Sequence, residues 1–596
     1  MSIKARDLIE MPKAHTPTWS PDGRGIAYCS NECGRPQVWW ADRQFKQKMK
    51  LTNLDRSITD IQYSPTTNSI LIHTESNGLE ISKFHVLDVT TGKLQRFPLL
   101  NGIHYFGTWS RNGEWIIYKS NERAKKYFDI YRISLRDMHR ELLVRNDSHN
   151  NLSSAASPDG RYFIYSRQTS PDSNEIYLHD LVTGSDELLS PVAEHSLFTS
   201  IQWGNDGNGL YLLTNWNREF KSVAFLDLHT KSMNWITSDT FDVESVRISP
   251  DGLKLAYIVN ESGRSKLVVR NLATGVDKPI PSPVGVIGQL SWSSDCHALA
   301  MSVNSVTRGL DVSIIELNDL TDTLSSESIR TSKPISVLPT SVTYRSFDNL
   351  TIPAWLYTPT FQQESSKKLP CVIHIHGGPA MQSRPTFQPL IQFLVANGFC
   401  VLDPNIRGST GYGKRYAHLD DGRARFNAIK DIIAARDFLK SVNYVDINHL
   451  ALVGGSYGGF MALCCLAHFP RLWAAAVISS AMADLESFLE RTSIHRRDFR
   501  EREYGSLNTD REFLRAISPI NHVQNIMAPL LIFHGINDVR VPVYESDRLV
   551  ERMHALGKPV RYVRFKDEGH GLDSTENKVK TYSEIADFLN HYLRAD

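Results

Sequence analysis

The sequence predicts a multidomain protein in which a seven-bladed β-propeller is followed by an α/β-hydrolase domain. Two observations support this. A turn-and-strand pattern recurs seven times in the first half of the chain, and the second half has a Gly-x-Ser-x-Gly turn between an apolar strand and an apolar helix. A chain of 596 residues is also too long for one hydrophobic core, so two or more domains are expected.

Each copy of the repeat has an aromatic or apolar residue, then Ser-Pro-Asp-Gly or a variant, then a β-rich run. Successive copies are 44, 46, 47, 47, 45 and 44 residues apart, a period typical of a four-stranded propeller blade. A pair of β-sandwiches would fit the strand density but would not explain these spacings. We expect the leading residue to pack between blades. The copies begin at Trp19, Tyr63, Trp109, Ala156, Trp203, Ile248 and Trp292.

The repeat sets the predicted domain bounds. Residues 14–322 are assigned to the propeller, residues 323–596 to the α/β-hydrolase domain, and residues 1–13 to an N-terminal segment. The stretch Asn318–Lys333 is polar and poor in apolar residues, so we interpret it as a linker.

Composition limits the partners. The formal net charge is +1, so charge favours neither nucleic acid nor an anionic membrane. The first residues lack the apolar run of a secretory signal, and no run approaches the roughly 18 apolar residues of a membrane helix. Seven scattered cysteines indicate reduced thiols in the cytoplasm. Cys29 and Cys33 lie four apart, but no second Cys or His pair nearby completes a metal site.

From about residue 335, apolar strands alternate with helical stretches, which indicates a mostly parallel sheet. Functional side chains in such folds lie just past the carboxyl ends of the strands. The predicted strands are Pro370–His376, Phe399–Asp403, Leu450–Val453, Ala474–Ser479, Leu530–Gly535 and Val560–Phe565.

Ser456 is the candidate nucleophile. It lies between Gly454 and Gly458 in a strand–turn–helix context, which is typical of a nucleophile elbow. The turn is tight enough to need glycine neighbours, and the following helix points its first N–H groups at developing negative charge. A passive serine in a glycine-rich turn is the alternative for this motif taken alone.

Asp538 and His570 are the candidate partners of Ser456. Each follows a predicted strand, and the chain order Ser, Asp, His is that of α/β-hydrolases. A serine hydroxyl needs a base, which His570 would provide, and Asp538 would fix the imidazole tautomer. The backbone N–H groups of Tyr457 and Gly378 would hold the oxyanion.

Other residues compete for these roles. Asp567, Asp573 and Asp484 are rival carboxylates, although Asp567 is too close to His570 in the chain to orient it easily. His374 and His376 alternate on a strand, so we interpret them as structural or pocket-lining residues.

With these motifs in order, the chain resembles the prolyl oligopeptidase family of serine peptidases, and within it the acylaminoacyl-peptidase and dipeptidyl-peptidase-like branch. The resemblance covers nearly the whole chain. It is strongest at His376–Pro379, Arg407–Gly413, Gly454–Gly459, Asn537–Pro542 and Asp567–Gly571.

The resemblance implies cleavage of short peptides, a propeller that excludes folded proteins, and an N-terminal segment that packs on the hydrolase domain. Arg540 matches an arginine that holds a substrate carbonyl, with a surface ion pair as the alternative. His376 stands where prolyl oligopeptidase itself has a tyrosine, which makes that subtype less suitable. The segment Gly422–Arg425 departs from a Gly-Gly-x-Asp-like stretch of relatives.

A basic group lies near the expected pocket region and indicates either a carboxylate-binding site or a solvated helix face, the commoner case. Its members are Arg491, Arg496, Arg497, Arg500 and Arg502.

The sequence therefore predicts a cytoplasmic serine exopeptidase or oligopeptidase that forms an acyl-enzyme and needs no metal or organic cofactor. Its expected partner is a short peptide or small acyl substrate, without nucleic acid or membrane, and a homo-oligomer is possible. The alternatives are an esterase or amidase acting on a small non-peptide substrate, and a catalytically idle propeller scaffold. The exact substrate and its subsites stay open.

Overall fold

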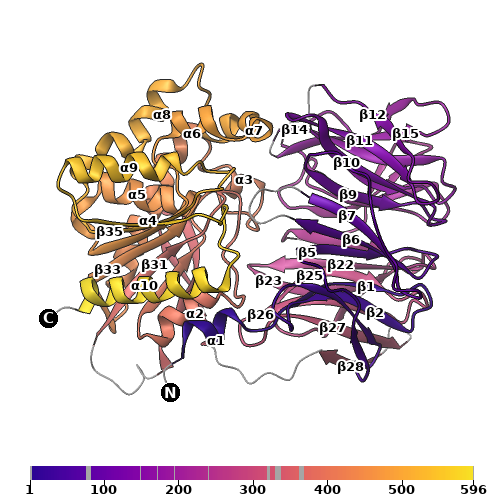
Figure 1. The fold of residues 1–596 in the computed structure, drawn as a ribbon, viewed down its shortest axis with the longest axis horizontal. Coiled ribbons are helices and arrows are strands. Elements are labelled where there is room, and N and C mark those ends of the chain that lie inside the picture. The colour runs from indigo at the N-terminus through magenta and orange to yellow at the C-terminus, as the bar shows by residue number, and fades with distance from the viewer. Residues whose placement is uncertain are drawn as a thin grey trace. The chain divides into compact units, whose positions relative to one another are not determined.

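The computed structural model describes residues 3–75, 82–147, 150–170, 172–193, 195–238, 240–318, 322–328, 337–360 and 368–594 (Figure 1). Contacts divide the chain into two compact units. The propeller unit comprises the described residues from 12 to 333. The hydrolase unit comprises the described residues before 12 and after 333. Each unit is described by itself.

The described residues of the propeller unit form seven four-stranded antiparallel sheets, each made of four consecutive strands. This confirms the predicted propeller of seven blades. Blades 1 to 4 contain β1 (Ala14–Trp19), β2 (Gly25–Ser30), β3 (Gln37–Asp42), β4 (Lys48–Lys50); β5 (Ser57–Tyr63), β6 (Ser69–Glu75), β7 (Ser82–Asp88), β8 (Leu94–Arg96); β9 (His104–Trp109), β10 (Trp115–Ala124), β11 (Tyr127–Ser134), β12 (Arg140–Val144); β13 (Asn150–Ala156), β14 (Tyr162–Ser170), β15 (Ser173–Asp180) and β16 (Asp186–Leu188). Blades 5 to 7 contain β17 (Phe198–Trp203), β18 (Gly209–Thr214), β19 (Ser222–Asp227), β20 (Met233–Trp235); β21 (Val243–Ile248), β22 (Lys254–Glu261), β23 (Arg264–Asn271), β24 (Asp277–Ile280); β25 (Val286–Trp292), β26 (Ala298–Ser305), β27 (Gly309–Asn318) and β28 (Asp322–Ser328).

The repeated Ser-x-Asp turn joins the first and second strands of a blade. In blade 1 the Ser20 hydroxyl donates to Asp22 Oδ1 at 2.6 Å, and Gly23 has a φ of +67°, which glycine adopts without strain. The Ser157–Asp159, Ser249–Asp251 and Ser293–Asp295 pairs repeat the bond, each at 2.5 Å. The periodic sequence motif is therefore a periodic turn.

Two tryptophans at the heads of repeats, Trp203 and Trp292, donate hydrogen bonds to neighbouring blades. Trp203 Nε1 donates to the Ala155 carbonyl oxygen at 3.1 Å, and Trp292 Nε1 donates to that of Arg247 at 3.1 Å. Each acceptor lies in the first strand of the preceding blade. For these residues the predicted inter-blade packing is confirmed.

Side chains close the ring between blade 7 and blade 1. Both blades consist of their own consecutive strands, so no strand is shared between them. Trp19 Nε1 donates to the Ser291 carbonyl oxygen at 3.0 Å. Arg43 binds both carboxylate oxygens of Glu316 at 2.6 Å and one of Asp295 at 2.7 Å. An apolar cluster with members from both blades lies at the same junction.

The interpretation of residues 318–333 as a linker is wrong over Asp322–Ser328, where the chain forms β28. This strand pairs with β27 in antiparallel register, with Ser313 opposite Ser328. Its polar composition does not prevent pairing, because an outer strand needs backbone partners on one side only. The flanking residues 319–321 and 329–333 lie outside the described residues.

The hydrolase unit is built on one eight-stranded sheet in the order β29-β30-β32-β31-β33-β34-β35-β36. Six of these strands, from β32 to β36 in the sheet order, are parallel to one another. At one edge, β29 pairs antiparallel with β30, and β30 pairs antiparallel with β32. The strands are β29 (Thr340–Arg345), β30 (Thr351–Tyr357), β31 (Leu369–Ile375), β32 (Cys400–Pro404), β33 (Val445–Gly455), β34 (Ala475–Ser479), β35 (Leu530–Gly535) and β36 (Val560–Phe565). This confirms the predicted α/β-hydrolase fold.

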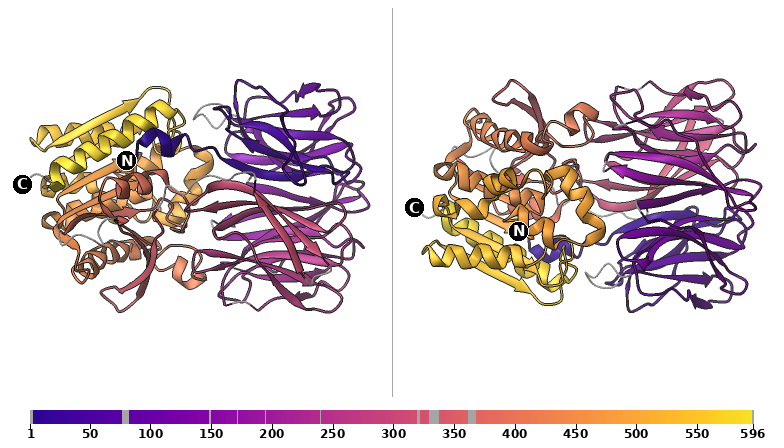
Figure 2. Two further views of the ribbon diagram at one scale, coloured as in Figure 1. Left: turned by 90° about the horizontal axis from the view of Figure 1, so that it is seen from below. Right: turned by 90° about the horizontal axis from the view of Figure 1, so that it is seen from above.

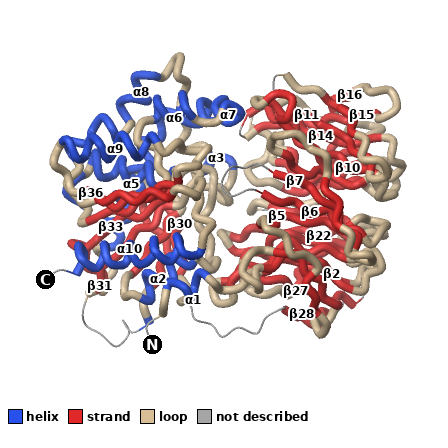
Figure 3. The backbone as a smooth tube through the Cα atoms, in the orientation of Figure 1, coloured by secondary structure: helices blue, strands red, loops and turns tan. Residues whose placement is uncertain are grey.

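Helices cover both faces of this sheet, as the blue and red segments of the hydrolase unit in Figure 3 show. One large apolar cluster includes α4, α5 and α9 side chains, and a second includes α2 and α10 side chains. The helices are α2 (Pro389–Ala396), α3 (Lys414–Ala417), α4 (Arg425–Leu439), α5 (Tyr457–His468), α6 (Leu485–Arg491), α7 (Ile494–Tyr504), α8 (Arg511–Ile517), α9 (Tyr544–Ala555) and α10 (Thr575–Arg594), with short 3-10 turns at Gly422–Ala424, Pro470–Leu472 and Pro519–Asn525.

The N-terminal helix α1 (Ala5–Ile9) belongs to the hydrolase unit. Its buried side chains pack with residues of α2 and α10, and both views of Figure 2 show α1 beside α10. Arg6 binds both carboxylate oxygens of Glu576 at 2.6 and 2.7 Å. The start of the chain is thereby attached to its last helix.

No helix among the described residues is long and apolar enough to cross a membrane.

Candidate active site

Ser456 lies between β33 and α5 in a backbone conformation that few residues adopt. Its φ of +54° and ψ of −121° place it outside the common regions for a residue with a side chain. A Cβ at Gly458 would lie 1.9 Å from the Ile375 carbonyl oxygen, and one at Gly454 would lie 2.4 Å from Gly458. The two glycines therefore let the turn pass close to β31 and fold back on itself. Ser456 and the preceding Gly455 are partly buried, whereas Gly454 and Tyr457 on either side of them are buried.

Asp538 and His570 meet at the same edge of the sheet. Asp538 lies three residues after β35 and His570 five residues after β36, and their Oδ2 and Nδ1 atoms are 2.7 Å apart. Asp538 Oδ1 also accepts hydrogen bonds from the backbone N–H groups of Arg540 at 2.8 Å and Val541 at 2.9 Å. The carboxylate is thus held in place by its own loop while its second oxygen faces the imidazole.

Burial opposes ionisation of Asp538, but hydrogen bonds from His534 and His570 outweigh it and hold the pKa of this carboxyl well below its usual range. Asp538 is therefore charged at neutral pH. A charged carboxylate at Nδ1 favours the imidazole tautomer that leaves Nε2 free to accept a proton. The His570 side chain is 21% exposed, so it is accessible to solvent beside the buried Asp538.

His534 is a neighbour of Asp538 that the sequence reasoning missed. Its Nε2 lies 3.4 Å from Asp538 Oδ2 and 2.9 Å from the Val541 carbonyl oxygen, and its Nδ1 lies 2.7 Å from the Ser546 hydroxyl. Asp538 therefore sits between two imidazoles. The His-x-x-x-Asp spacing at the end of a strand is the only sequence signal that could have indicated the contact.

Glu568 fixes the loop that carries His570. Its carboxylate accepts hydrogen bonds from the backbone N–H groups of Asp573 at 2.6 Å and Ser574 at 3.0 Å, just before α10. Its carbonyl oxygen accepts one from the Asn537 N–H at 2.9 Å. The loops of Asp538 and His570 are thus bonded to each other through backbone as well as through side chains.

The structure brings Asp538 and His570 together and places Ser456 at the same edge, after β33. The three loops follow β33, β35 and β36, parallel strands of one sheet with β34 between the first two, so all three loops lie at the carboxyl ends of the strands. Within the described residues the Ser456 hydroxyl makes no hydrogen bond with His570. In structures without substrate such bonds are often long and tighten only in the reacting complex.

The predicted oxyanion donors flank Ser456. Tyr457 is the first residue of α5, so helix geometry leaves its backbone N–H without an intrahelical acceptor. On the other side, a Cβ at Gly377 would lie 3.8 Å from the Ser456 Cβ, which places the loop of Gly377 and Gly378 against the nucleophile turn. Gly378 has a φ of +125°, a conformation that side chains rarely allow.

The other predicted residues have separate contacts. Asp484 caps α6 and pairs with Arg548 at 2.9 Å, so its carboxylate is engaged by these groups. His374 pairs with buried Asp403 at 2.9 Å, and His376 Nε2 lies 2.9 Å from the Ser409 hydroxyl, which fits their structural interpretation. Arg540 is exposed two residues after Asp538.

Two of the basic residues near α7 contact neighbouring side chains. Arg500 pairs with Glu503 at 2.6 Å, and the Arg491 guanidinium lies 3.9 Å from the ring centroid of Tyr544. These contacts are those of helix-face residues.

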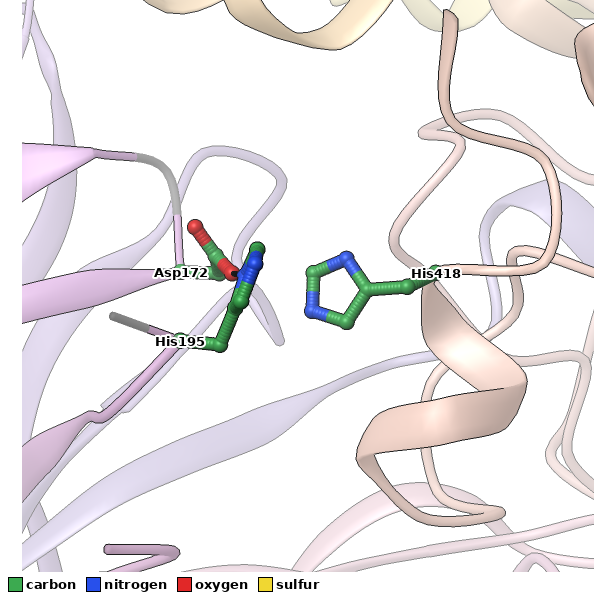
Figure 4. Close-up of side chains that lie close together, drawn as sticks. All are labelled: Asp172, His195 and His418. Atoms are coloured by element: carbon green, nitrogen blue, oxygen red, sulfur yellow. Dashed lines mark hydrogen bonds and ion pairs between the residues drawn. The ribbon is translucent and has the colours of Figure 1, made fainter. Parts of the chain in front are cut away.

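Figure 4 draws a further set of side chains with metal-ligating atoms, Asp172, His195 and His418. Asp172 and His195 belong to the propeller unit, where His195 Nδ1 pairs with Asp172 Oδ2. His418 belongs to the hydrolase unit, where its Nδ1 pairs with Asp421 at 2.7 Å. Each of these two contacts lies within a single unit.

Comparison with known proteins agrees with this fold. Residues 385–596 match the model of the Prolyl oligopeptidase family, and residues 9–200 match that of the TolB beta propeller domain. The C-terminal part of the chain belongs to the prolyl oligopeptidase family. The protein is thus a serine hydrolase of a peptidase family, as the sequence predicted.

Relatives in this family match over different lengths. Dipeptidyl aminopeptidase BIII of Pseudoxanthomonas mexicana is 26% identical over 99% of this chain and 88% of its own. Acylamino-acid-releasing enzyme 1 of Oryza sativa is 25% identical over 39% of this chain and 31% of its own. A puromycin-hydrolyzing peptidase of Mycobacterium tuberculosis has the same fold, with a TM-score of 0.89 and 19% identity over 100% of this chain and 96% of that one.

Proposed function

We propose that the protein hydrolyses short peptides through an acyl-enzyme on Ser456, with His570 as general base and acid and Asp538 as its orienting carboxylate. The observation that carries the proposal is the 2.7 Å pair of His570 Nδ1 and Asp538 Oδ2 at the sheet edge where the Ser456 turn lies. Gly378 and Tyr457 supply the two backbone N–H groups of the oxyanion hole.

The proposed reaction has two halves. His570 Nε2 takes the Ser456 proton as the hydroxyl attacks the scissile carbonyl carbon, and the resulting oxyanion accepts hydrogen bonds from Gly378 and Tyr457. His570 then gives the proton to the leaving amine, and the C–N bond breaks. In the second half His570 activates water, which attacks the acyl-enzyme and releases the acid. Asp538 stays ionised and stabilises the imidazolium.

The names of the relatives support short peptides as substrates. One relative is named for removal of dipeptides, another for release of acylated amino acids, and a structural neighbour for hydrolysis of puromycin. The first two names describe the release of a small unit from a peptide. We propose that this chain also acts on a chain end, that Arg540 holds a substrate carbonyl there, and that the propeller limits substrate size.

Labelling with a fluorophosphonate tests the nucleophile. We expect one covalent adduct on Ser456 in the native protein and none in Ser456→Ala. Peptide mapping by mass spectrometry locates the adduct. A native protein without an adduct on Ser456 would favour an idle scaffold.

Substrate profiling tests the peptide assignment. The experiment measures kcat/KM for four classes of substrate. They are peptides with a free amino-terminal dipeptide, N-acetylated peptides, peptides with another amino-terminal block, and nitrophenyl esters. We expect cleavage of at least one peptide class that Ser456→Ala does not cleave. Turnover of esters without any peptide cleavage would favour an esterase instead.

We also propose a cytoplasmic location without a metal or organic cofactor. The seven cysteines are free thiols, which suits a reducing compartment. Cell fractionation tests the location, and turnover after dialysis against a chelator tests the metal. The oligomeric state is measured by light scattering.

A further inference from the structure

Tyr457 joins the proposed oxyanion hole to a buried polar network. Its backbone follows Ser456, while its side chain is 1% exposed and points into the core of the hydrolase unit. The Tyr457 hydroxyl donates to Asp420 Oδ2 at 2.9 Å and accepts from Arg425 Nη1 at 3.2 Å. The residue proposed to bind the oxyanion through its backbone is therefore fixed at its other end by an ion pair.

Arg425 is the centre of this network. The whole side chain is buried, Nη1 binds Asp420 Oδ2, and Nη2 donates to the Glu503 carbonyl oxygen at 2.8 Å. The guanidinium also lies 5.2 Å from the ring centroid of Tyr457 and 4.9 Å from that of Tyr504. One cation thus holds the starts of α4 and α5 and the end of α7.

Stability alone does not explain an ion pair at this place. Taking two charges out of water is costly, and well-packed apolar residues of similar volume often stabilise a core at least as well. Within the described residues, Asp420 Oδ1 and Arg425 Nε are buried without hydrogen-bond partners, so the pair is not even fully satisfied. What the pair supplies is direction, because it fixes where the Tyr457 hydroxyl can lie.

Asp420 also contacts the loop after β32. A Cβ at Gly408 would lie 2.3 Å from Asp420 Oδ1, so the carboxylate fits against a position that only glycine can occupy. The network therefore connects four segments that are far apart in the sequence.

We propose that Asp420, Arg425 and the Tyr457 hydroxyl are positioning groups that set the direction of the Tyr457 backbone N–H toward the oxyanion. The proposal rests on the proposed function of Ser456 and Tyr457. Ser456 has an unusual backbone conformation, so the start of α5 needs support from outside the turn. A donor displaced by a fraction of an ångström would lose much of its transition-state stabilisation.

The test compares Tyr457→Phe with Tyr344→Phe. Tyr344 belongs to the same apolar cluster, and its buried hydroxyl has no partner in the described part of the chain. Both variants lose one buried phenolic oxygen, but only one loses the network. We expect Tyr457→Phe to lower the rate of fluorophosphonate labelling of Ser456 about tenfold. Its Tm should equal that of Tyr344→Phe, and its KM for a peptide substrate should be unchanged. Tyr344→Phe labels at the native rate.

Two further variants test whether the groups act as a unit. Arg425→Met and Asp420→Asn should each lower the labelling rate at least tenfold, and the double variant should be no slower than the slower single variant. Hydrogen exchange of the peptide covering residues 454–462, measured by mass spectrometry, should be faster in Tyr457→Phe, Arg425→Met and Asp420→Asn than in Tyr344→Phe. This readout does not need activity.

Native labelling rate and native exchange in Tyr457→Phe would overturn the proposal, and so would rates that fall only in proportion to the folded fraction. A native protein that is not labelled would instead overturn the proposed function, and the exchange data would still decide whether the network positions α5.

Discussion

The propeller unit and the hydrolase unit use their apolar residues in different ways. In the propeller unit they form several separate clusters of modest size, most of them with members from neighbouring blades. In the hydrolase unit most of them form two large clusters on the two faces of one sheet. A propeller contact therefore repeats around the ring, whereas a hydrolase contact occurs once. Changes in the hydrolase unit should affect chemistry most, and changes in the propeller should affect local stability.

The largest expected effect is that of Asp538→Asn. The amide can still accept from Arg540 and Val541, so the loop should keep its shape, but the carboxylate that accepts from His570 Nδ1 is lost. We expect kcat to fall about 10⁴-fold with little change in Tm, because the imidazole tautomer is no longer fixed. Steady-state kinetics and thermal melting measure the two effects.

The matched control is Asp567→Asn. Asp567 is an exposed carboxylate three residues before His570, so its replacement by asparagine should have no effect on turnover. The assignment fails if Asp567→Asn inactivates the enzyme while Asp538→Asn does not.

Trp203 provides the corresponding change in the propeller. Trp203→Ala removes an 8% exposed indole and its bond to Ala155, and we expect the propeller unit to lose about 3–5 kcal/mol of unfolding free energy. Trp203→Phe keeps most of the packing and should cost about 1 kcal/mol. Calorimetry measures the losses, and labelling of Ser456 at 25 °C should stay native in both. Loss of labelling would show that the units do not differ as described.

Glu545 predicts a pH effect in the hydrolase unit. Its buried carboxylate accepts from the backbone N–H groups of Ala483 and Asp484, and burial raises its pKa to about 7. The folded state thus binds this proton more tightly than the unfolded state. The stability it contributes is complete in acid and is lost as pH rises toward 7, by on the order of 1 kcal/mol per pH unit.

The measurement is Tm between pH 5 and 8 for the native protein and Glu545→Gln. The variant should lack this slope, whereas Glu551→Gln, an exposed change on the same helix α9, should keep it. Identical slopes in all three proteins would contradict the prediction.

The smallest expected effect is that of Arg43→Met at the junction of blades 7 and 1. Arg43 and Glu316 are each 26% exposed, and such ion pairs contribute about 1 kcal/mol or less. Calorimetry should show a small loss of unfolding free energy for Arg43→Met and none for Arg24→Met, because the Arg24 side chain is 84% exposed. A loss as large as that of Trp203→Ala would mean that the ring depends on this one pair.

Local patterns were enough to predict much of the fold. The Ser-x-Asp-Gly turns marked the blades, since each turn is made by residues that are adjacent in the chain. The elbow at Ser456 was recognisable from its Gly-x-Ser-x-Gly pattern, although the close contact that requires Gly458 is with Ile375 of the distant strand β31. The polar strand β28 was missed, because pairing on one edge requires no apolar pattern.

The sequence by itself determined the number of blades, the type of the second sheet and the family of the hydrolase, because periodicity and backbone tolerance are properties of short segments. Only the tertiary structure decided that Asp538, and not a rival carboxylate, contacts His570, that His534 lies on its other side, and that Arg425 meets Tyr457. These residues are separated by up to tens of positions in the chain. Sheet order and helix packing bring them together, and the spacing of residues in the sequence predicts neither.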